Sequence, residues 1–171
     1  EEGKLMEAQN LVEVLGSVVK HPFVDLALCH IDRAVDDKES ASENIQRLLR
    51  ENPDDDLLLQ YIGIYFLKYG GYDMSLPLFK KAASLNTEND EHIMNIGSVF
   101  YQMEEYDSSA YYFTKVIERD SSNIKAWYNR AETRFKRQQD DEACQDIQQI
   151  LEIEPRAERP ESTLRKCGIE E

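Results

Sequence analysis

The sequence predicts an all-α fold in which helical hairpins stack into an α-solenoid. Three observations support this prediction: the chain repeats itself every 34 residues, each period holds two stretches with helical spacing of apolar residues, and only seven glycines and five prolines occur among 171 residues. So few turn-forming residues argue against an all-β fold. A chain of this length corresponds to about one domain and can bury a sizeable core.

The repeat is visible when the chain is shifted by 34 residues, because four columns of similar residues then align. Two columns hold small residues and two hold mainly larger apolar residues. The columns are Cys29, Gly63, Gly97 and Ala131; Ala41, Ser75, Ser109 and Ala143; Ile45, Phe79, Phe113 and Ile147; and Leu48, Ala82, Val116 and Ile150. We expect the two small columns to face each other, so that the backbones approach closely while the large residues interlock. A single hairpin would leave an apolar flank exposed, so several must stack.

The N-terminal segment, residues 1–21, is expected to flank or cap this array. Its apolar residues Leu11, Val14, Leu15 and Val18 share one helical stripe. That stripe fits either the second helix of a partial preceding repeat or a cap on the first complete one.

The first repeat, residues 22–55, is the least regular. Asp25 and Asp32 stand in columns that are apolar in later repeats. The sequence therefore leaves open whether the first helix of this repeat is shifted in register relative to the others. Its second helix is expected to begin with a capping box from Ser40 to Glu43.

The later repeats, 56–89, 90–123 and 124–157, each contain two clear apolar stripes. In the first of them, Gly70 and Gly71 are expected to form the turn inside the hairpin, with Asp73 capping the next helix. In the last of them, Arg130 and Arg134 occupy positions that are apolar in the inner repeats. These arginines predict the end of the stack, paired with Glu158 or Glu161. The remaining segment, 158–171, is expected as a short capping helix or a frayed tail.

The fourth repeat, which runs from Ile124 through Trp127 and Ala131 to Pro155, closely resembles a tetratricopeptide repeat. Four such repeats would cover 136 of the 171 residues. The resemblance implies a right-handed superhelix of about four repeats with flanking helices. It also implies a non-enzymatic interaction module, a scaffold or adaptor, whose concave groove is lined by the first helix of each repeat.

The resemblance also says which residues should line this groove. The predicted peptide-binding residues are Gln60, Tyr61, Asn95, Tyr101, Lys125, Tyr128 and Asn129. Amide side chains can grip the backbone of an extended peptide, and tyrosines give broad amphipathic contact. On the wider face, Lys68, Lys125 and Lys136 stand against Glu91 and Glu132, a net charge of +1. The alternative interpretation is that these are ordinary helix-pairing residues on a solvated face.

Some co-chaperones that resemble this family hold acidic tails of heat-shock chaperones with a five-residue carboxylate clamp. The corresponding positions in this chain are Gln60, Ile64, Asn95, Lys125 and Asn129, of which two match the clamp. Each missing cation removes charge-assisted hydrogen bonds worth roughly 1.5–3 kcal/mol. We therefore expect no such clamp.

No catalytic or cofactor constellation is recognisable in the sequence. With 34 acidic residues, adjacent carboxylates arise by chance and are better interpreted as helix caps. His21, His30 and His92 are not spaced as zinc ligands, so no metal site is predicted. Cys29 is expected to be a small core residue. Two alternatives to the groove remain: a structural subunit that contacts partners through the ends of the solenoid, and an enzyme completed by residues of another domain.

The charge and the cysteine content of the chain indicate which classes of partner and which cellular compartment to expect. A net charge of −14 argues against nucleic acid and anionic membranes, so a protein or peptide partner is predicted. The longest apolar stretch, Leu57 to Leu67, is too short to span a membrane, and no secretion signal is recognisable. Three cysteines without a CxxC pair predict a reducing, cytoplasmic location. Because the chain does not begin with methionine, we expect it to belong to a larger protein or complex.

Overall fold

The computed structural model describes residues 7, 8, 10–12, 14, 21–34, 36–155 and 166–169. Secondary structure in these residues is helical, and no strand occurs among them. Most of the segments 1–21 and 158–171, including Glu158 and Glu161, lies outside the described residues. The chain divides into two compact units, Glu1–Asn86 and Thr87–Glu171.

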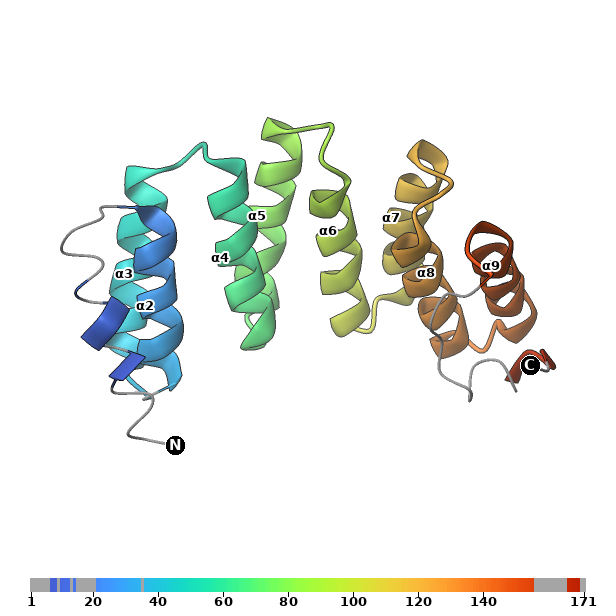
Figure 1. Ribbon diagram of the computed structural model, residues 1–171, viewed down its shortest axis with the longest axis horizontal. Helices are drawn as coiled ribbons and strands as arrows, with labels where there is room; N and C mark the ends of the chain where they lie inside the picture. The colour runs from blue at the N-terminus through green and yellow to red at the C-terminus, as the bar shows by residue number, and fades with distance from the viewer. Residues whose placement is uncertain are drawn as a thin grey trace. The chain divides into compact units, whose positions relative to one another are not determined.

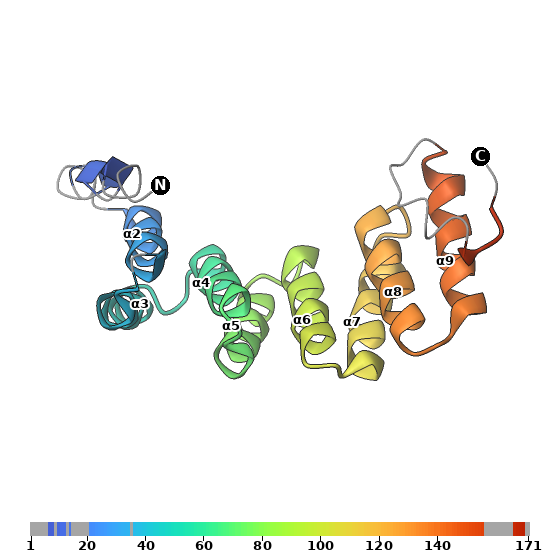
Figure 2. The same ribbon diagram turned by 90° about the horizontal axis from the view of Figure 1, so that it is seen from below.

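The first unit contains two helical hairpins (Figure 1). Their helices are α2 (Pro22–Ala34), α3 (Lys38–Glu51), α4 (Asp56–Lys68) and α5 (Tyr72–Leu85). Helix α2 packs on α3, α4 packs on α5, and α2 also touches α4. Figure 2 views α2 and α3 nearly end on, as a closely packed pair.

The second unit repeats this arrangement. Its helices are α6 (Asp90–Gln102), α7 (Tyr106–Arg119), α8 (Ile124–Lys136) and α9 (Asp140–Ile153). Each helix packs on the next in sequence, and α6 also contacts α8, so the first helices of its two hairpins are neighbours. The first helices of successive hairpins therefore begin 34 residues apart along the chain.

The turn inside each hairpin depends on one left-handed residue. These residues are Asp36, Gly70, Glu104 and Gln138, with φ of 65°, 78°, 61° and 60°. They also lie 34 residues apart, and only one is the glycine that this conformation favours. After Gly70, helix α5 begins at Tyr72 behind Gly71, without a side-chain cap, so the expectation that Asp73 caps it was wrong.

The first repeat is regular in structure although it is irregular in sequence. Helix α2 begins at Pro22, in step with the later repeats, so its register is not shifted. The expected capping box at Ser40 was wrong. Helix α3 is instead capped by Asp37, whose carboxylate accepts a hydrogen bond from the Ser40 N–H at 3.0 Å.

The two unexpected aspartates of this repeat are bound by α3. Asp25 pairs with Arg47 at 3.1 Å. Asp32 is buried and accepts hydrogen bonds from the Ser40 hydroxyl at 3.2 Å and the Asn44 amide at 3.4 Å. Polar groups can replace apolar ones in these columns because the neighbouring helix supplies their partners.

The small residues serve two different contacts. A Cβ atom at Gly63 or Gly97 would lie 2.7 Å from the ring of Phe79 or Phe113, so each glycine makes room for a phenylalanine. The small residues of the other column were expected to face these glycines. Ser109 instead lies against the next hairpin, where its hydroxyl is 3.2 Å from that of Thr133 on α8.

The arginines near the end of the array bind a partner within their own hairpin. Arg130 makes a two-pronged contact with Asp146 of α9, at 2.7 and 3.0 Å, and Arg134 contacts the same carboxylate at 2.6 Å. Arg130 also donates to the Thr114 hydroxyl and lies over the Trp127 ring. The pairing expected with Glu158 or Glu161 lies outside the described residues, within which both arginines bind the buried Asp146.

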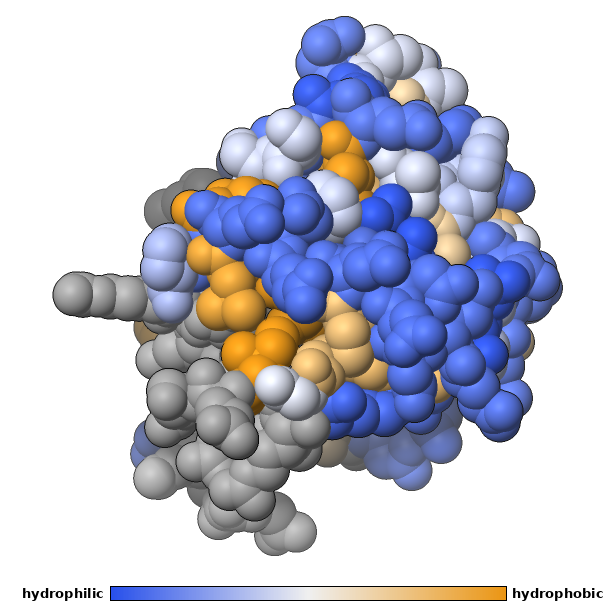
Figure 3. Space-filling view, turned by 90° about the vertical axis from the view of Figure 1, so that its right-hand side faces the viewer, coloured by the Kyte–Doolittle hydropathy of each residue, from blue (hydrophilic) through white to orange (hydrophobic). Residues whose placement is uncertain are grey.

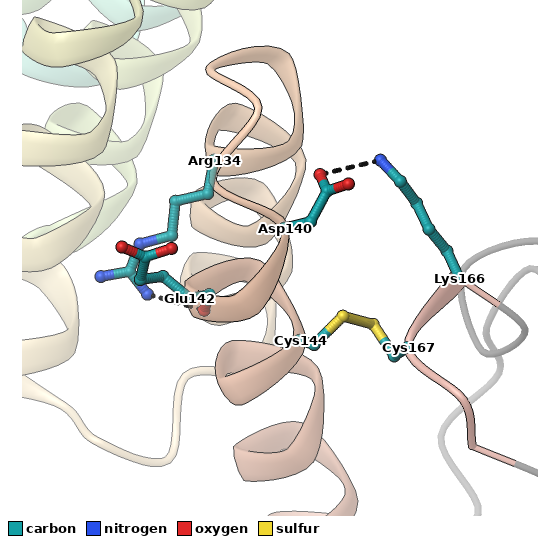
Figure 4. The surroundings of a disulfide bond; sticks show 6 residues. All are labelled: Arg134, Asp140, Glu142, Cys144, Lys166 and Cys167. Atoms are coloured by element: carbon teal, nitrogen blue, oxygen red, sulfur yellow. Dashed lines mark hydrogen bonds and ion pairs between the residues drawn. A yellow bond between two sulfur atoms is a disulfide. The ribbon is translucent and has the colours of Figure 1, made fainter.

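A disulfide joins Cys144 of α9 to Cys167, near the C-terminus (Figure 4). Beside it, Lys166 pairs with Asp140 at 3.1 Å and lies over the ring of Phe135. Cys167 and Ile169 pack against the core formed by α8 and α9. The short segment 166–169 is therefore held on the last hairpin by covalent, ionic and apolar contacts.

Candidate functional site

A cavity of about 230 Å³ lies in the second unit, between the first helices of its two hairpins. The C-terminal part of α6 and the middle of α8 contribute most of the lining side chains, and α7 contributes one aromatic ring. The lining residues are Ser98, Tyr101, Gln102, Phe113, Asn129 and Glu132. Phe113 also lines the floor of the cavity, but it is only 1% exposed and so offers little surface to a ligand.

The polar walls carry hydrogen-bonding groups that the protein itself does not use. Asn95, one turn before Ser98 on α6, has a buried amide nitrogen with no hydrogen-bond partner among the described residues. The side-chain amides of Gln102 and Asn129 likewise make no hydrogen bond within the described part of the chain. Only the Asn95 nitrogen is buried, whereas Gln102 is exposed and Asn129 half-buried, so these two amides can exchange water for a ligand at a modest gain in free energy.

Two phenols and one carboxylate share the same region. The Tyr128 side chain lies near the carboxylate of Glu132, four residues later on α8. Burial raises the pKa of Tyr128 above its usual value, and the negative charge of Glu132 adds to this. The pKa of Tyr101 is raised by the same two causes in the same order. Both phenols therefore stay protonated at neutral pH and remain hydrogen-bond donors.

Lys125, a predicted groove residue, is not a free cation. It stands in the first turn of α8, and its ammonium lies 3.5 Å from the carboxylate of Glu91 on α6. Both side chains are exposed, so this pair adds little to stability. It does neutralise the positive charge that was expected to face a ligand.

The other two predicted residues, Gln60 and Tyr61, belong to α4 of the first unit. The ring of Tyr61 is 46% exposed and meets Phe23 edge-on at 5.2 Å. The side-chain oxygen of Gln60 is buried and has no hydrogen-bond partner in the described structure. The second unit thus holds Asn95, Tyr101, Lys125, Tyr128 and Asn129, while Gln60 and Tyr61 lie in the first.

Two residues of the cavity, Glu132 and Phe113, were predicted from the sequence only in part. Glu132 was counted only as a charge on the wider face, although its spacing of four from Tyr128 puts both on one helix face. Phe113 was expected only as a core residue, and it also forms the cavity floor.

Other site chemistries find little support in the described residues. No group of three or more histidine, cysteine or acidic side chains there could hold a metal ion. Cys29 is fully buried, as expected for a core residue, and burial together with nearby carboxylates raises the pKa of its thiol to about 12. None of the helices described has both the length and the apolarity needed to cross a membrane.

Comparison with known proteins shows which solved structures have a similar fold. A family model of the tetratricopeptide repeat matches residues 125–157. No curated protein matches the chain in sequence. One similar solved structure is the first tetratricopeptide domain of Spaghetti (RPAP3) bound to the HSP90 peptide SRMEEVD. It is 25% identical, with a TM-score of 0.61 over 66% of this chain and 90% of that one.

Two other solved structures extend over most of the chain. MamA is 18% identical, with a TM-score of 0.68 over 93% of this chain and 91% of its own. YrrB, described as a tetratricopeptide protein with an unusual peptide-binding site, is 17% identical, with a TM-score of 0.65 over 90% of this chain and 80% of its own. At this identity the likeness concerns the fold. The chain therefore has the helical-repeat solenoid fold that these structures share, and its residues 125–157 match the tetratricopeptide repeat.

Proposed function

We propose that the chain is a non-enzymatic scaffold or adaptor module that binds a peptide or partner helix along the first helices of its repeats. The observation that carries this proposal is the cavity between α6 and α8, with its unpaired amides and its tyrosines. The similar RPAP3 domain is described as bound to a peptide, and YrrB as having a peptide-binding site. A helical-repeat module with such a groove fits recognition of an extended segment.

In this proposal the amides of Asn95, Gln102 and Asn129 bind the main chain of the peptide. Each peptide unit offers one N–H and one C=O, and an amide side chain can pair with both. Tyr101 and Tyr128 would pack against the peptide side chains, because a tyrosine gives a large contact area and loses little conformational freedom.

Substitution of one amide tests the proposal. Peptides that bind the full chain are first selected from a phage-displayed library of random dodecapeptides. We expect Asn129→Ala to weaken the selected peptides about tenfold in a fluorescence anisotropy titration, with little change in the thermal unfolding temperature. Gln145→Ala, on the exposed side of α9, is the matched control and should bind as the wild type does. If Asn129→Ala binds the selected peptides as tightly as Gln145→Ala does, the groove is not the peptide-binding site.

A second candidate function is a structural subunit that contacts its assembly through the end of the stack. On the face seen in Figure 3, a group of hydrophobic residues lies beside hydrophilic ones. Ile153, the last residue of α9, is 37% exposed. Exposed apolar surface of this kind favours association. Light scattering coupled to size-exclusion chromatography decides: a stable oligomer supports this candidate, and a monomer removes self-association from it.

A chaperone-tail clamp is the function we expect least. Of the clamp positions, Gln60 and Ile64 cannot supply the required charge and hydrogen bonds, and Lys125 is already paired with Glu91. The heptapeptide SRMEEVD, named in the RPAP3 structure, is the direct probe. We expect no saturable binding of this peptide by calorimetry, and saturable binding would reinstate the clamp.

The cytoplasmic location predicted from the sequence stays a prediction, as does the absence of nucleic acid among the partners. The Cys144–Cys167 bond weighs against a reducing compartment, because such bonds are rare in the cytosol. Protein isolated from its native source under rapid alkylation distinguishes the cases. Three alkylated cysteines would support the cytoplasm, whereas one, Cys29 after denaturation, would exclude it.

A further inference from the structure

The carboxylate of Glu132 is the one charged group in the wall of the cavity. Other acidic side chains of the second unit that are buried or partly buried have cationic partners. Asp146 is held by Arg130 and Arg134, and Asp90 lies 3.1 Å from Arg119. Glu132 is half-buried, yet no lysine or arginine in the described part of the chain forms an ion pair with it.

The groups around Glu132 leave most of its hydrogen-bonding capacity free. A carboxylate offers about four lone-pair directions, and the nearby Tyr128 hydroxyl can fill at most one of them. On the same helix, Lys136 stands four residues after Glu132 but forms no ion pair with it in the described structure, and Lys125 is paired with Glu91. Since Tyr101 and Tyr128 both keep their protons, they present neutral rings with electron-rich faces rather than extra negative charge.

We propose that this cavity accepts a lysine or arginine side chain of the bound peptide, so that the module selects basic rather than acidic segments. The inference rests on the proposed function and adds the chemistry of the partner. The ammonium or guanidinium group would donate to Glu132, and the alkyl stem would lie within the cavity. The Tyr101 ring would lie beside the cation.

The size and charge of the site agree with such an occupant. A volume of about 230 Å³ far exceeds the roughly 10–15 Å³ that one water molecule needs by the same measure. An acidic side chain would meet the like charge of Glu132 in a partly desolvated site, which is unfavourable. A net charge of −14 attracts any basic peptide at long range, so the test must separate this general attraction from the contribution of the cavity.

The test uses the full chain and peptides selected as above. In the best binder, each lysine and arginine is replaced by glutamine in turn, and both peptide series are titrated against wild type, Glu132→Gln and Glu118→Gln. Glu118 is exposed on α7, so its substitution removes one negative charge away from the cavity. Circular dichroism and Trp127 fluorescence check that both variants are folded.

The proposal expects basic residues to be enriched among selected peptides. One replacement in the peptide should weaken binding to wild type about tenfold or more, and binding to Glu132→Gln by less than about twofold. Glu118→Gln should behave as wild type does.

Three outcomes would overturn the inference. If Glu118→Gln loses as much affinity as Glu132→Gln, only general charge matters and the cavity has no preference. If selected peptides lack basic residues, or bind Glu132→Gln unchanged, while Asn129→Ala still weakens them, the proposed function stands and the inference fails. If no peptide depends on Asn129 either, the proposed function fails, and the inference fails with it.

Discussion

The contact between Gly97 and Phe113 makes the strongest prediction for stability. An alanine at position 97 would place its Cβ 2.7 Å from one ring carbon of Phe113 and 3.0 Å from two others. Carbon atoms in favourable contact are about 3.5–4.0 Å apart, so the methyl group would overlap the ring. Phe113 is 1% exposed and surrounded by Met94, Val116 and Ile117, so the ring cannot move aside without disturbing the core.

The expected magnitude follows from two opposing effects. Replacing a helical glycine with alanine stabilises a helix by up to about 1 kcal/mol. Overpacking a core by one methyl group typically destabilises it by about 1–3 kcal/mol. We therefore expect Gly97→Ala to lower the free energy of unfolding by about 1 kcal/mol. Gly97→Leu, which adds more volume, should lower it further.

Urea denaturation followed by the fluorescence of Trp127 is the appropriate assay. Trp127 is the only tryptophan and packs against the Phe113 cluster, so its signal reports the second unit. The control is a double-mutant cycle in which Phe113→Leu removes the ring. In that background Gly97→Ala should be neutral or stabilising. If Gly97→Ala is as stable as wild type, or destabilises equally with and without the ring, the reasoning is refuted.

Three further predictions concern the turns, the buried ion pair and the core thiol. Glu104→Gly should raise the free energy of unfolding by about 0.5–1 kcal/mol, because glycine adopts positive φ without strain, and Gly70→Ala should lower it by about 1 kcal/mol. Both are measured by urea melts, and effects of the opposite sign would contradict the role of the turn. Asp146→Ala should destabilise by about 3–5 kcal/mol, since it leaves Arg130 buried without its counter-charge, and a calorimetric loss below about 1 kcal/mol would refute this. Cys29 should resist alkylation at pH 8.5 until the protein unfolds, because burial first, and nearby carboxylates next, raise its pKa to about 12. The neutral thiol is favoured in the fold, so its stabilising contribution is complete below pH 9 and declines as pH rises toward 12; modification of the native protein would contradict this.

The repeating hairpins could be predicted because their cause is periodic. Small and large residues recur every 34 positions, and the helices begin at the same interval. The left-handed turn residues could be predicted only in part. Glycine commonly adopts positive φ, so Gly70 indicates a turn, whereas glutamate and glutamine rarely do, so Glu104 and Gln138 do not. Glutamate and glutamine adopt positive φ there because the packed helices on either side fix the turn, which local sequence does not reveal.

Contacts that depend on the choice between several similar residues could not be predicted. Ser40 and Asp37 are both good capping residues, and only the path of the chain decides that Asp37 caps α3. The partner of Arg130 was sought among C-terminal glutamates, whereas Asp146 lies on the facing side of the adjacent helix. The sequence has 34 acidic residues, so charge alone does not select the partner.

The candidate site was predictable in outline and not in detail. The repeat places Tyr101, Tyr128 and Asn129 on first helices, and the structure has them there. Whether Asn95 is satisfied, and whether Lys125 is paired, depends on side-chain positions that helical periodicity does not determine. That Glu132 has no ion-pair partner among the described residues becomes clear only when the contacts of the neighbouring lysines and arginines are known.

The link between Cys144 and Cys167 has a consequence for the stability of the hairpin formed by α8 and α9. Closing a loop across a sequence separation of 23 lowers the entropy of the unfolded chain, which corresponds to about 3 kcal/mol in the chain-entropy model. Glutathione, by opening this loop, would loosen the last hairpin, so the number of repeats that stay folded would follow the redox potential of the surrounding solution.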